Sequence, residues 1–315
     1  MEEIQNKIRR EVVQLLSEGQ VDVVIGFEQG SLPLRATPFF LRDIADANRL
    51  VWSPFCENNL ATYLTKIQGK RVGLIAKGCD VRSVVALLVE KQIHRDHIVI
   101  IGVPCQGMVD RRRIEREVDG EILKAHQEGE EIIVEGRDFR KSLPRKEYIY
   151  PSCKRCEHRN PLIYDTLIGE KLVEEAERAY HEVEAFEKLS PDKRWSHFSE
   201  ETSRCIRCYA CRQACPMCYC AECFVDSSFP KWIEKGLDPS DVQFWNIVRA
   251  YHQTGRCVGC GACERACPME IDLVYLTQKI NRDVKELFGF EAGLDLDPPP
   301  PLSTYKVDDE QEFIK

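Results

Sequence analysis

The sequence predicts an α/β N-terminal domain with a mostly parallel sheet and a β-hairpin edge, followed by an α-helical, cysteine-rich C-terminal domain. In the first half, apolar runs of strand length alternate with stretches of helical spacing. This alternation is typical of parallel strands joined by crossover helices. From residue 195 onward, runs of β-branched residues are rare, and helical pieces separate loops that contain cysteine. A chain of 315 residues is long enough for two such domains.

Local patterns predict the elements of the first domain, which we expect over residues 1–165. The first 20 residues are charged, have helical spacing and lack the apolar stretch of a signal peptide. The stretch 121–141 has the pattern of a β-hairpin, which would form the antiparallel edge of the sheet. Between these two segments we expect strands at 21–27, 49–52, 71–77 and 97–104, and helices at 57–67, 79–92 and 108–118.

A linking helix is predicted between the domains, at 166–198, because residues 168–189 have the spacing of a long amphipathic helix. Ser190 followed by Pro191 is a helix-start signal. The C-terminal domain is then predicted over 199–290. Its helices are expected at 243–253 and 273–288.

Charge and hydropathy exclude several classes of protein. The formal net charge of −8 argues against nucleic acid and anionic membranes as partners, because both attract an excess of Lys and Arg. The sequence contains no run of about 18 apolar residues, which is the length needed to span a membrane. Because it also lacks a signal peptide, we expect a cytoplasmic location. The tail, 291–315, carries seven acidic residues, two lysines and four consecutive prolines, and we expect it to be extended and exposed.

Sixteen cysteines indicate metal binding rather than disulfides, because they are clustered in a chain predicted to be cytoplasmic. Eight of them form two copies of the run Cys-x2-Cys-x2-Cys-x3-Cys-Pro. In bacterial ferredoxins, the first three cysteines of such a run bind one 4Fe-4S cube and the fourth binds the other. A pair of zinc sites is the alternative, but zinc favours separated Cys-x2-Cys pairs. The expected ligands are Cys205, Cys208, Cys211 and Cys267 for cluster one, and Cys257, Cys260, Cys263 and Cys215 for cluster two.

The two runs are 41 residues apart, and the segment between them has helical content. Residues 200–288 therefore resemble the α-helical ferredoxin domain of heterodisulfide reductase small subunits and of fumarate reductase iron–sulfur subunits. Arginines next to the ligands would offset the negative charge of the cubes and raise their potentials, although an ordinary surface role is an equal alternative for each. They are Arg204, Arg207, Arg212, Arg256 and Arg265.

The N-terminal half contains five further cysteines that could meet at one edge of the sheet. Cys56, Cys79 and Cys105 each follow a predicted strand and precede a predicted helix, and ligands bind at that edge of parallel sheets. Cys153 and Cys156 follow the predicted hairpin. A buried cysteine behaving as a small apolar residue is the alternative for each one singly, but together these thiols favour a third 4Fe-4S cluster.

The segments GVPCQG (102–107), AKGCDVRSV (76–84) and SCKRCEHRNPLIYDTLIGE (152–170) resemble the beta-subunit family of deazaflavin-reducing hydrogenases and dehydrogenases, over about 50–175. The resemblance implies an α/β module that holds a 4Fe-4S cluster, FAD and the deazaflavin. It also implies Cys105, Cys153 and Cys156 as ligands of cluster three, with Cys79 as the fourth. The family's Ser-Gly-Gly opening has no counterpart here, and a loop poor in glycine offers few bare N–H groups to a pyrophosphate. FAD therefore stays an open question.

Cys218, Cys220 and Cys223 lie just past the first ferredoxin run and need a fourth partner to hold a cube. Cys56 is the remaining cysteine, so these four are the expected ligands of a tentative cluster four. Cys56 and Cys79 could exchange roles, and a small zinc site or spare thiols are the alternatives. His158 and His252 lie nearest the cysteine loops and could cap or tune a cube, but packing or surface roles are favoured for both.

These patterns predict an iron–sulfur electron-transfer subunit of a cytoplasmic, anaerobic redox complex. The resemblance to heterodisulfide-reductase-like, flavin-bifurcating assemblies implies partner subunits that carry flavin or metal. We see no Ser-His-Asp set, phosphate-binding loop or HExxH motif, so no catalytic residue is assigned. One alternative is a flavin-containing oxidoreductase that itself reduces deazaflavin or a nicotinamide, and another is a zinc-dependent scaffold. We expect about 12 to 16 iron atoms per chain, in three to four cubes, and a count near eight would remove clusters three and four.

Overall fold

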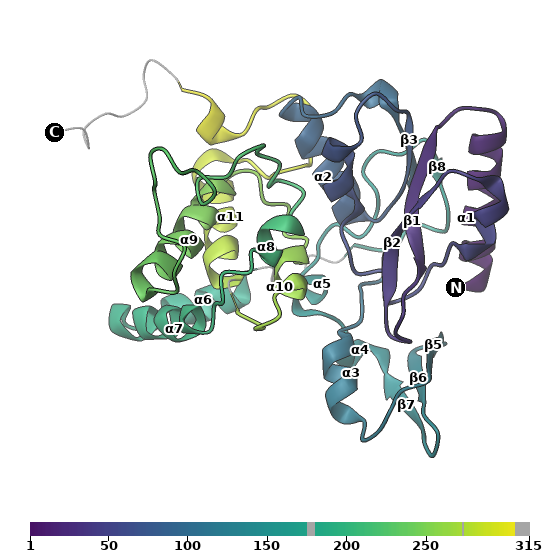
Figure 1. Ribbon diagram of the computed structural model, residues 1–315, viewed down its shortest axis with the longest axis horizontal. Helices are drawn as coiled ribbons and strands as arrows, with labels where there is room; N and C mark the ends of the chain where they lie inside the picture. The colour runs from purple at the N-terminus through teal and green to yellow at the C-terminus, as the bar shows by residue number, and fades with distance from the viewer. Residues whose placement is uncertain (175–179, 273, 306–315) are drawn as a thin grey trace.

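A computed structural model of the chain describes residues 1–174, 180–272 and 274–305. Figure 1 shows a sheet with helices on both sides, a group of helices beside it, and a small second sheet below. The prediction of an α/β part joined to a helical part is confirmed. Among the described residues, no helix is both long and apolar enough to cross a membrane.

The main sheet has the strand order β2-β1-β3-β4-β8. Its centre is built from β1 (Val23–Gln29), β3 (Val72–Ala76) and β4 (Ile98–Gly102), which pair in parallel. Every residue of β3 is buried, as expected for a strand covered on both faces. Helices α1 (Glu2–Ser17) and α2 (Gly78–Val89) lie on opposite sides of this sheet (Figure 1). These elements agree with the strands and helices predicted for the same segments.

The antiparallel edge of the sheet was predicted in the wrong place. The edge strand is β2 (Ala36–Leu41), which pairs with β1. The predicted hairpin instead belongs to a separate three-stranded sheet of β5 (Lys124–Glu128), β6 (Glu131–Glu135) and β7 (Arg140–Pro144). Ile132 and Val134 of β6 pack in a second apolar cluster with Val109 and Ile114, and so face away from the main core. The same cluster packs against α3 (Arg111–Glu117) and α4 (Arg145–Tyr148).

Two shorter segments also differ from the prediction. No strand forms at 49–52, where Leu50 makes only an isolated bridge with Glu28, and the preceding residues form the 3-10 helix η1 (Ile44–Arg49). The segment predicted as a helix at 57–67 contains the 3-10 helix η2 (Leu60–Lys66), which Asn59 caps through its side chain. A 3-10 turn η3 (Arg95–His97) precedes β4.

The predicted linking helix is shorter than expected. Residues 166–167 form the edge strand β8 (Thr166–Leu167), and residues 168–174 are not helical. The side chain of Asn160 accepts from the backbone N–H of Leu172 and donates to its carbonyl, both at 2.8 Å, which holds this stretch extended. Residues 175–179 lie outside the described residues. Helix α6 (His181–Glu187) follows, and α7 (Pro191–Ser203) begins at the predicted start signal with Ser190 as its N-cap.

The helical part contains α8 (Ala210–Gln213), α9 (Pro239–His252), α10 (Ala262–Ala266) and α11 (Val274–Phe288). The two long helices agree with the helices predicted at 243–253 and 273–288, except that residue 273 is not described. Trp245 of α9 anchors a small apolar core with Val225 and Ile233. The short helix α5 (Pro151–Lys154) contacts this region, because Arg265 of α10 donates to the hydroxyl of Ser152 at 3.3 Å.

Hydrogen bonds join the two parts of the chain. Arg112 of α3 donates to the carbonyl of Cys267 at 2.8 Å, and Thr62 donates to the carbonyl of Ala214 at 3.1 Å. Arg82 of α2 donates to the carbonyl of Ala292 at 2.6 Å, and Ala292 is buried. The start of the tail is therefore packed on α2, which corrects the prediction that it is exposed. The 3-10 turn η4 (Pro301–Ser303) follows, and residues 306–315 lie outside the described residues.

Candidate metal centres

All 16 cysteines are free thiols in this structure, so none forms the disulfides considered as an alternative. Fifteen of them line three cavities in or beside the helical part. We call these the sheet-edge cavity, the inner cavity and the surface cavity.

The sheet-edge cavity lies where β3 and β4 end, as the strand–helix pattern predicted. Cys79 is in the first turn of α2, Cys105 follows β4, and Cys153 belongs to α5. The structure thus brings together the four cysteines predicted for cluster three, with two cysteines of cluster two beside them. The cysteines that line it are Cys79, Cys105, Cys153, Cys156, Cys257 and Cys260.

The inner cavity lies within the helical part, between the loops of the two ferredoxin runs. All four cysteines predicted for cluster one line it, including the distant Cys267. Cys267 belongs to the second run, but its position before Pro268 predicted that it would join the cysteines of the first. Two cysteines of cluster two complete its wall. The cysteines that line it are Cys205, Cys208, Cys211, Cys257, Cys263 and Cys267.

The four cysteines predicted for cluster two lie where the three cavities adjoin one another. Cys257 lines both the sheet-edge cavity and the inner cavity, whereas Cys215 lines the surface cavity. Burial raises the pKa of Cys257 to about 11, and the neighbouring Cys263 and Cys215 contribute to this rise. Cys260 is likewise close to Cys215 and Cys263. The four thiols predicted for cluster two are therefore close together, although no single cavity is lined by all four.

The surface cavity holds the three cysteines that the ferredoxin spacing left over. Cys218, Cys220 and Cys223 line it together with Cys215 and three arginines. The side-chain amide of Gln253 contacts two of these thiols, Cys215 at 3.5 Å and Cys218 at 3.4 Å. The hydrogen bond with Cys215 lowers the pKa of Cys218, so this thiol ionises more readily than its buried neighbours.

Cys56 does not join these three, contrary to the prediction for cluster four. Its side chain is fully buried in the core of the α/β part, where its sulfur accepts from the N–H of Ser53 at 3.3 Å. Burial raises the pKa of this thiol. The prediction assumed that a sheet strand at 49–52 would deliver Cys56 to the sheet edge, and that strand does not form. Cys56 has the role of a small apolar core residue.

The spacing of the cysteines tests whether they suit single zinc ions or larger clusters. Four sulfurs bound to one zinc ion at about 2.3 Å lie roughly 3.8 Å from one another. Among the described residues, the one group of three or more His, Cys, Asp or Glu ligand atoms within 4.8 Å of one another is Glu157, His158 and Glu291. Within the described part of the chain, no set of three or more cysteines has this close spacing.

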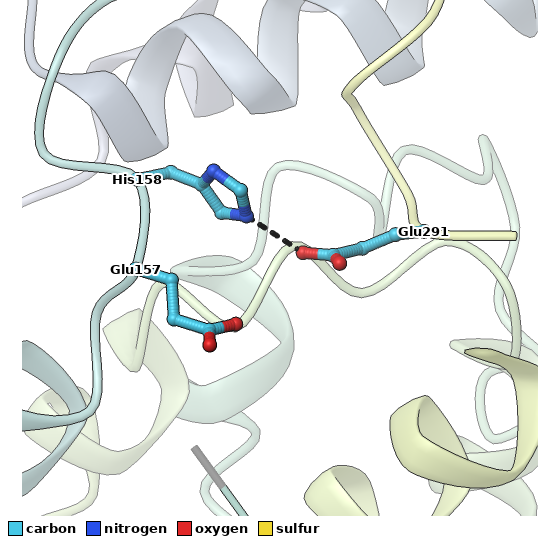
Figure 2. Close-up of side chains that lie close together, drawn as sticks. All are labelled: Glu157, His158 and Glu291. Carbon is cyan, nitrogen blue, oxygen red and sulfur yellow. Dashed lines mark hydrogen bonds and ion pairs between the residues drawn. The ribbon is translucent and has the colours of Figure 1, made fainter. Parts of the chain in front are cut away.

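The close group of Glu157, His158 and Glu291 closes the rim of the sheet-edge cavity (Figure 2). His158 Nε2 lies 2.8 Å from a carboxylate oxygen of Glu291, which also pairs with Arg82 and Lys285, each at 3.0 Å. The hydrogen bond with His158 lowers the pKa of Glu291 to about 2, and Arg82 adds to the effect. Because cations already balance Glu291, this group is an ion-pair cluster that ties the tail to the cavity rim.

Burial makes several of these thiols poor acids. The pKa of Cys105 is raised to about 12 by burial and by the nearby Cys153, and the pKa of Cys260 is raised to about 12, mainly by burial. Such thiols stay protonated at neutral pH unless a metal binds, because a coordinating thiol is deprotonated by the metal itself. The donor set therefore fits 4Fe-4S clusters, whose usual ligands are cysteine thiolates.

Three charged residues near the cysteines had no distinctive sequence signal. Lys77 is fully buried beside the sheet-edge cavity, 3.0 Å from Asp80, and its ammonium lies over the ring of Phe27. Arg249 of α9 is buried behind the cysteines of the helical part. Glu291 looked like one acid among many in the tail. Only their position in the fold distinguishes these side chains from surface charges.

His252, one of the two histidines nearest the cysteine loops, lines the surface cavity against the ring of Phe224.

The chain is similar in sequence to known iron–sulfur proteins. A family model described as a 4Fe-4S dicluster domain matches residues 201–271. The F420-dependent formate dehydrogenase subunit beta of Methanocaldococcus jannaschii is 26% identical over 350 aligned positions, covering 91% of this chain and 91% of that protein. The F420-dependent formate dehydrogenase 1 subunit beta of Methanococcus maripaludis is 24% identical over 355 positions, covering 91% and 90%.

A chain of the F420-reducing [NiFe] hydrogenase complex from Methanosarcina barkeri superposes with a TM-score of 0.41 at 14% identity, covering 65% of this chain and 90% of that one. The predicted resemblance to deazaflavin-linked beta subunits is confirmed by the two sequence relatives, because F420 is a deazaflavin. The resemblance to heterodisulfide reductase stays a prediction. The chain is an iron–sulfur protein with a 4Fe-4S dicluster domain, and a homologue of the beta subunits of F420-dependent formate dehydrogenases.

Proposed function

We propose that this chain is the electron-transferring beta subunit of an F420-linked redox complex, in which partner subunits carry flavin or a catalytic metal. The observation that carries the proposal is the set of three cysteine-lined cavities with shared walls. Cys257 belongs to two of them, and Cys215 of the same predicted ligand set belongs to the third. Adjacent clusters held in this way would pass electrons without any bond-making step, and no catalytic side chain is required.

The shared walls support a definite order for the clusters. Cys79 of cluster three is close to Cys260 of cluster two, and Cys211 of cluster one is close to Cys263 of cluster two. Cluster two would therefore lie between the other two. Electrons that enter at the sheet edge would reach the helical surface through cluster two.

Cys218, Cys220 and Cys223 would bind a further metal group in the surface cavity. Three thiols are placed there beside three arginines, a setting that favours an anionic group. Cys56 would not supply the fourth ligand, because its side chain is fully buried in the core of the α/β part. Cys220→Ala should lower the iron content of the purified protein while leaving the other three clusters in place. Unchanged iron content would show that these cysteines are spare thiols.

The second candidate function is that of an enzyme: reduction of F420 by the chain itself, through bound FAD. The names of the two relatives favour it, since both are F420-dependent and are aligned over nearly their whole length. Against FAD stands the opening of the chain, where α1 leads into β1 without a paired-glycine loop.

Anaerobic purification of the full chain separates the two candidates. The electron-transfer proposal expects about 12 to 16 iron and sulfide atoms per chain, rapid reduction by a viologen, no stoichiometric flavin, and no F420 reduction without partners. One FAD per chain together with F420 reduction by the isolated chain would establish the second candidate instead. A protein without iron would refute both.

A further inference from the structure

Two buried arginines lie among the cysteines without a carboxylate partner. The side chains of Arg265 and Arg249 leave only 7% and 4% of their surface exposed. Arg265 donates to the carbonyl of Glu57 at 2.8 Å, to the carbonyl of Cys260 at 2.8 Å and to the hydroxyl of Ser152 at 3.3 Å. Arg249 donates to the carbonyl of Cys211 at 3.1 Å, and its Nε has no partner. All these acceptors are uncharged.

Arg207 and Arg145 are also buried without an ion pair among the described residues, but neither lines one of the three cavities. Three other arginines near the cysteines are arranged differently. Arg204 pairs with Glu201, Arg212 with Asp226, and Arg256 with Glu90, so each already has its countercharge. In the described part of the chain, neither Arg265 nor Arg249 has such an ion pair. A buried, uncompensated charge costs several kcal/mol. The fold therefore needs a negative group next to each of these two guanidinium groups.

Each arginine adjoins the cysteines of two different clusters. Arg265 lines the sheet-edge cavity with Cys79 and Cys153 of cluster three, and binds the carbonyl of Cys260 of cluster two. Burial alone would lower the pKa of Arg265, but nearby Cys153, Cys260 and Cys79 raise it above its ordinary value.

Arg249 lies behind the loop of Cys211 of cluster one. It is also close to Cys263 and Cys215 of cluster two. Burial again acts to lower the pKa of this arginine, and the negative charge that the surrounding cysteines carry once ionised outweighs it. Both arginines thus lie between neighbouring clusters of the predicted order.

We propose that Arg265 and Arg249 are built-in countercharges that raise the reduction potentials of the clusters on either side of them. This rests on the proposed function, because it assumes clusters at the predicted ligand sets. A fixed positive charge stabilises the reduced, more negative form of a cluster, and burial keeps solvent from screening it. Arg265 acts on clusters two and three, and Arg249 acts on clusters one and two.

The test is a redox titration of the anaerobically purified full chain, followed by low-temperature electron paramagnetic resonance. Cys105→Ala identifies the signal of cluster three. Arg265→Met should lower the potentials of clusters two and three and leave cluster one unchanged, whereas Arg249→Met should lower those of one and two and leave three unchanged. Arg265→Lys keeps the charge and should restore most of the wild-type potentials. Arg204→Met is the matched control: it removes an exposed, paired arginine next to Cys205, and should shift no potential appreciably.

Unchanged potentials in iron-replete Arg265→Met and Arg249→Met proteins would overturn the proposal. It would also be wrong if Arg265→Met and Arg265→Lys lost iron equally, because packing rather than charge would then matter. Loss of iron in the Met variant alone would support a countercharge that the cluster needs for assembly. Failure of the proposed function is distinguishable, since it would appear as missing iron or absent electron exchange in the wild-type protein.

Discussion

Replacement of Cys105 by alanine tests the sheet-edge site most directly. Cys105 lines the cavity with three other cysteines of predicted cluster three, and its sulfur accepts from the N–H of Gly107 at 3.4 Å. With clusters one, two and three present, the chain would hold about 12 iron atoms, of which about four belong to this cube. Cys105→Ala should thus lose about a third of the iron and acid-labile sulfide. If the more exposed clusters are only partly filled in the purified protein, cluster three holds a larger fraction of the total iron, and the fractional loss should be larger.

The assay is anaerobic iron and sulfide quantification, combined with the paramagnetic signals of the dithionite-reduced protein. Cys56→Ala is the matched control, because Cys56 comes from the same domain but is fully buried away from the three cavities. It should keep the full iron content and lose only about 1 kcal/mol of stability, from the small cavity it creates. If Cys105→Ala keeps all its iron, or if Cys56→Ala loses as much as Cys105→Ala, the ligand set of cluster three is wrong.

Three further predictions concern the supports of the site. Lys77→Met should lower the free energy of unfolding by about 3–5 kcal/mol in anaerobic denaturant titrations, because it leaves Asp80 buried without its partner; Lys7→Met, at an exposed pair, should leave the midpoint unchanged. Gly293→Ala should release the tail to limited proteolysis, because φ at Gly293 is +76° and an added Cβ would lie 2.2 Å from the carbonyl oxygen of Arg82; protection equal to wild type would contradict this. Glu291→Gln should cost about 1–2 kcal/mol after allowance for solvent screening. Because the folded-state pKa of Glu291 is lowered from 4.5 to about 2, this contribution is present above pH 4.5 and is lost as the pH falls toward 2, so the difference from wild type should persist between pH 5 and 7.

The parts of the site that sequence could predict are those set by local spacing. A Cys-x2-Cys-x2-Cys run can reach three corners of one cube by itself. The spacing before Pro268 also predicted that Cys267 would join the first run, and the two line the same cavity. Cys79 and Cys105 were predictable because each follows a strand whose burial on both faces is evident from its apolar run.

The parts that failed depend on contacts far along the chain. Cys56 was assigned to a cluster because Leu50 was taken to lie in a sheet strand, but the bridge to Glu28 is isolated and the thiol turns into the core. The long helix expected at 168–189 does not begin there, because Asn160 binds both backbone groups of Leu172. Arg249 and Glu291 owe their roles to partners from other elements. No periodicity in their own segments carries that information.

Exposure of the cysteines indicates where a partner would exchange electrons with this chain. Cys208 of predicted cluster one and Cys220 of the surface cavity are the exposed cysteines, whereas those of the sheet-edge cavity are partly buried. The tail closes that cavity through Glu291, which His158 and Arg82 hold in place. A partner that docks on the helical part would therefore reach cluster one directly, and cluster three only by way of cluster two. Because Arg265 and Arg249 both lie beside cysteines predicted for cluster two, their positive charges would favour reduction of that cluster, through which every such electron would pass.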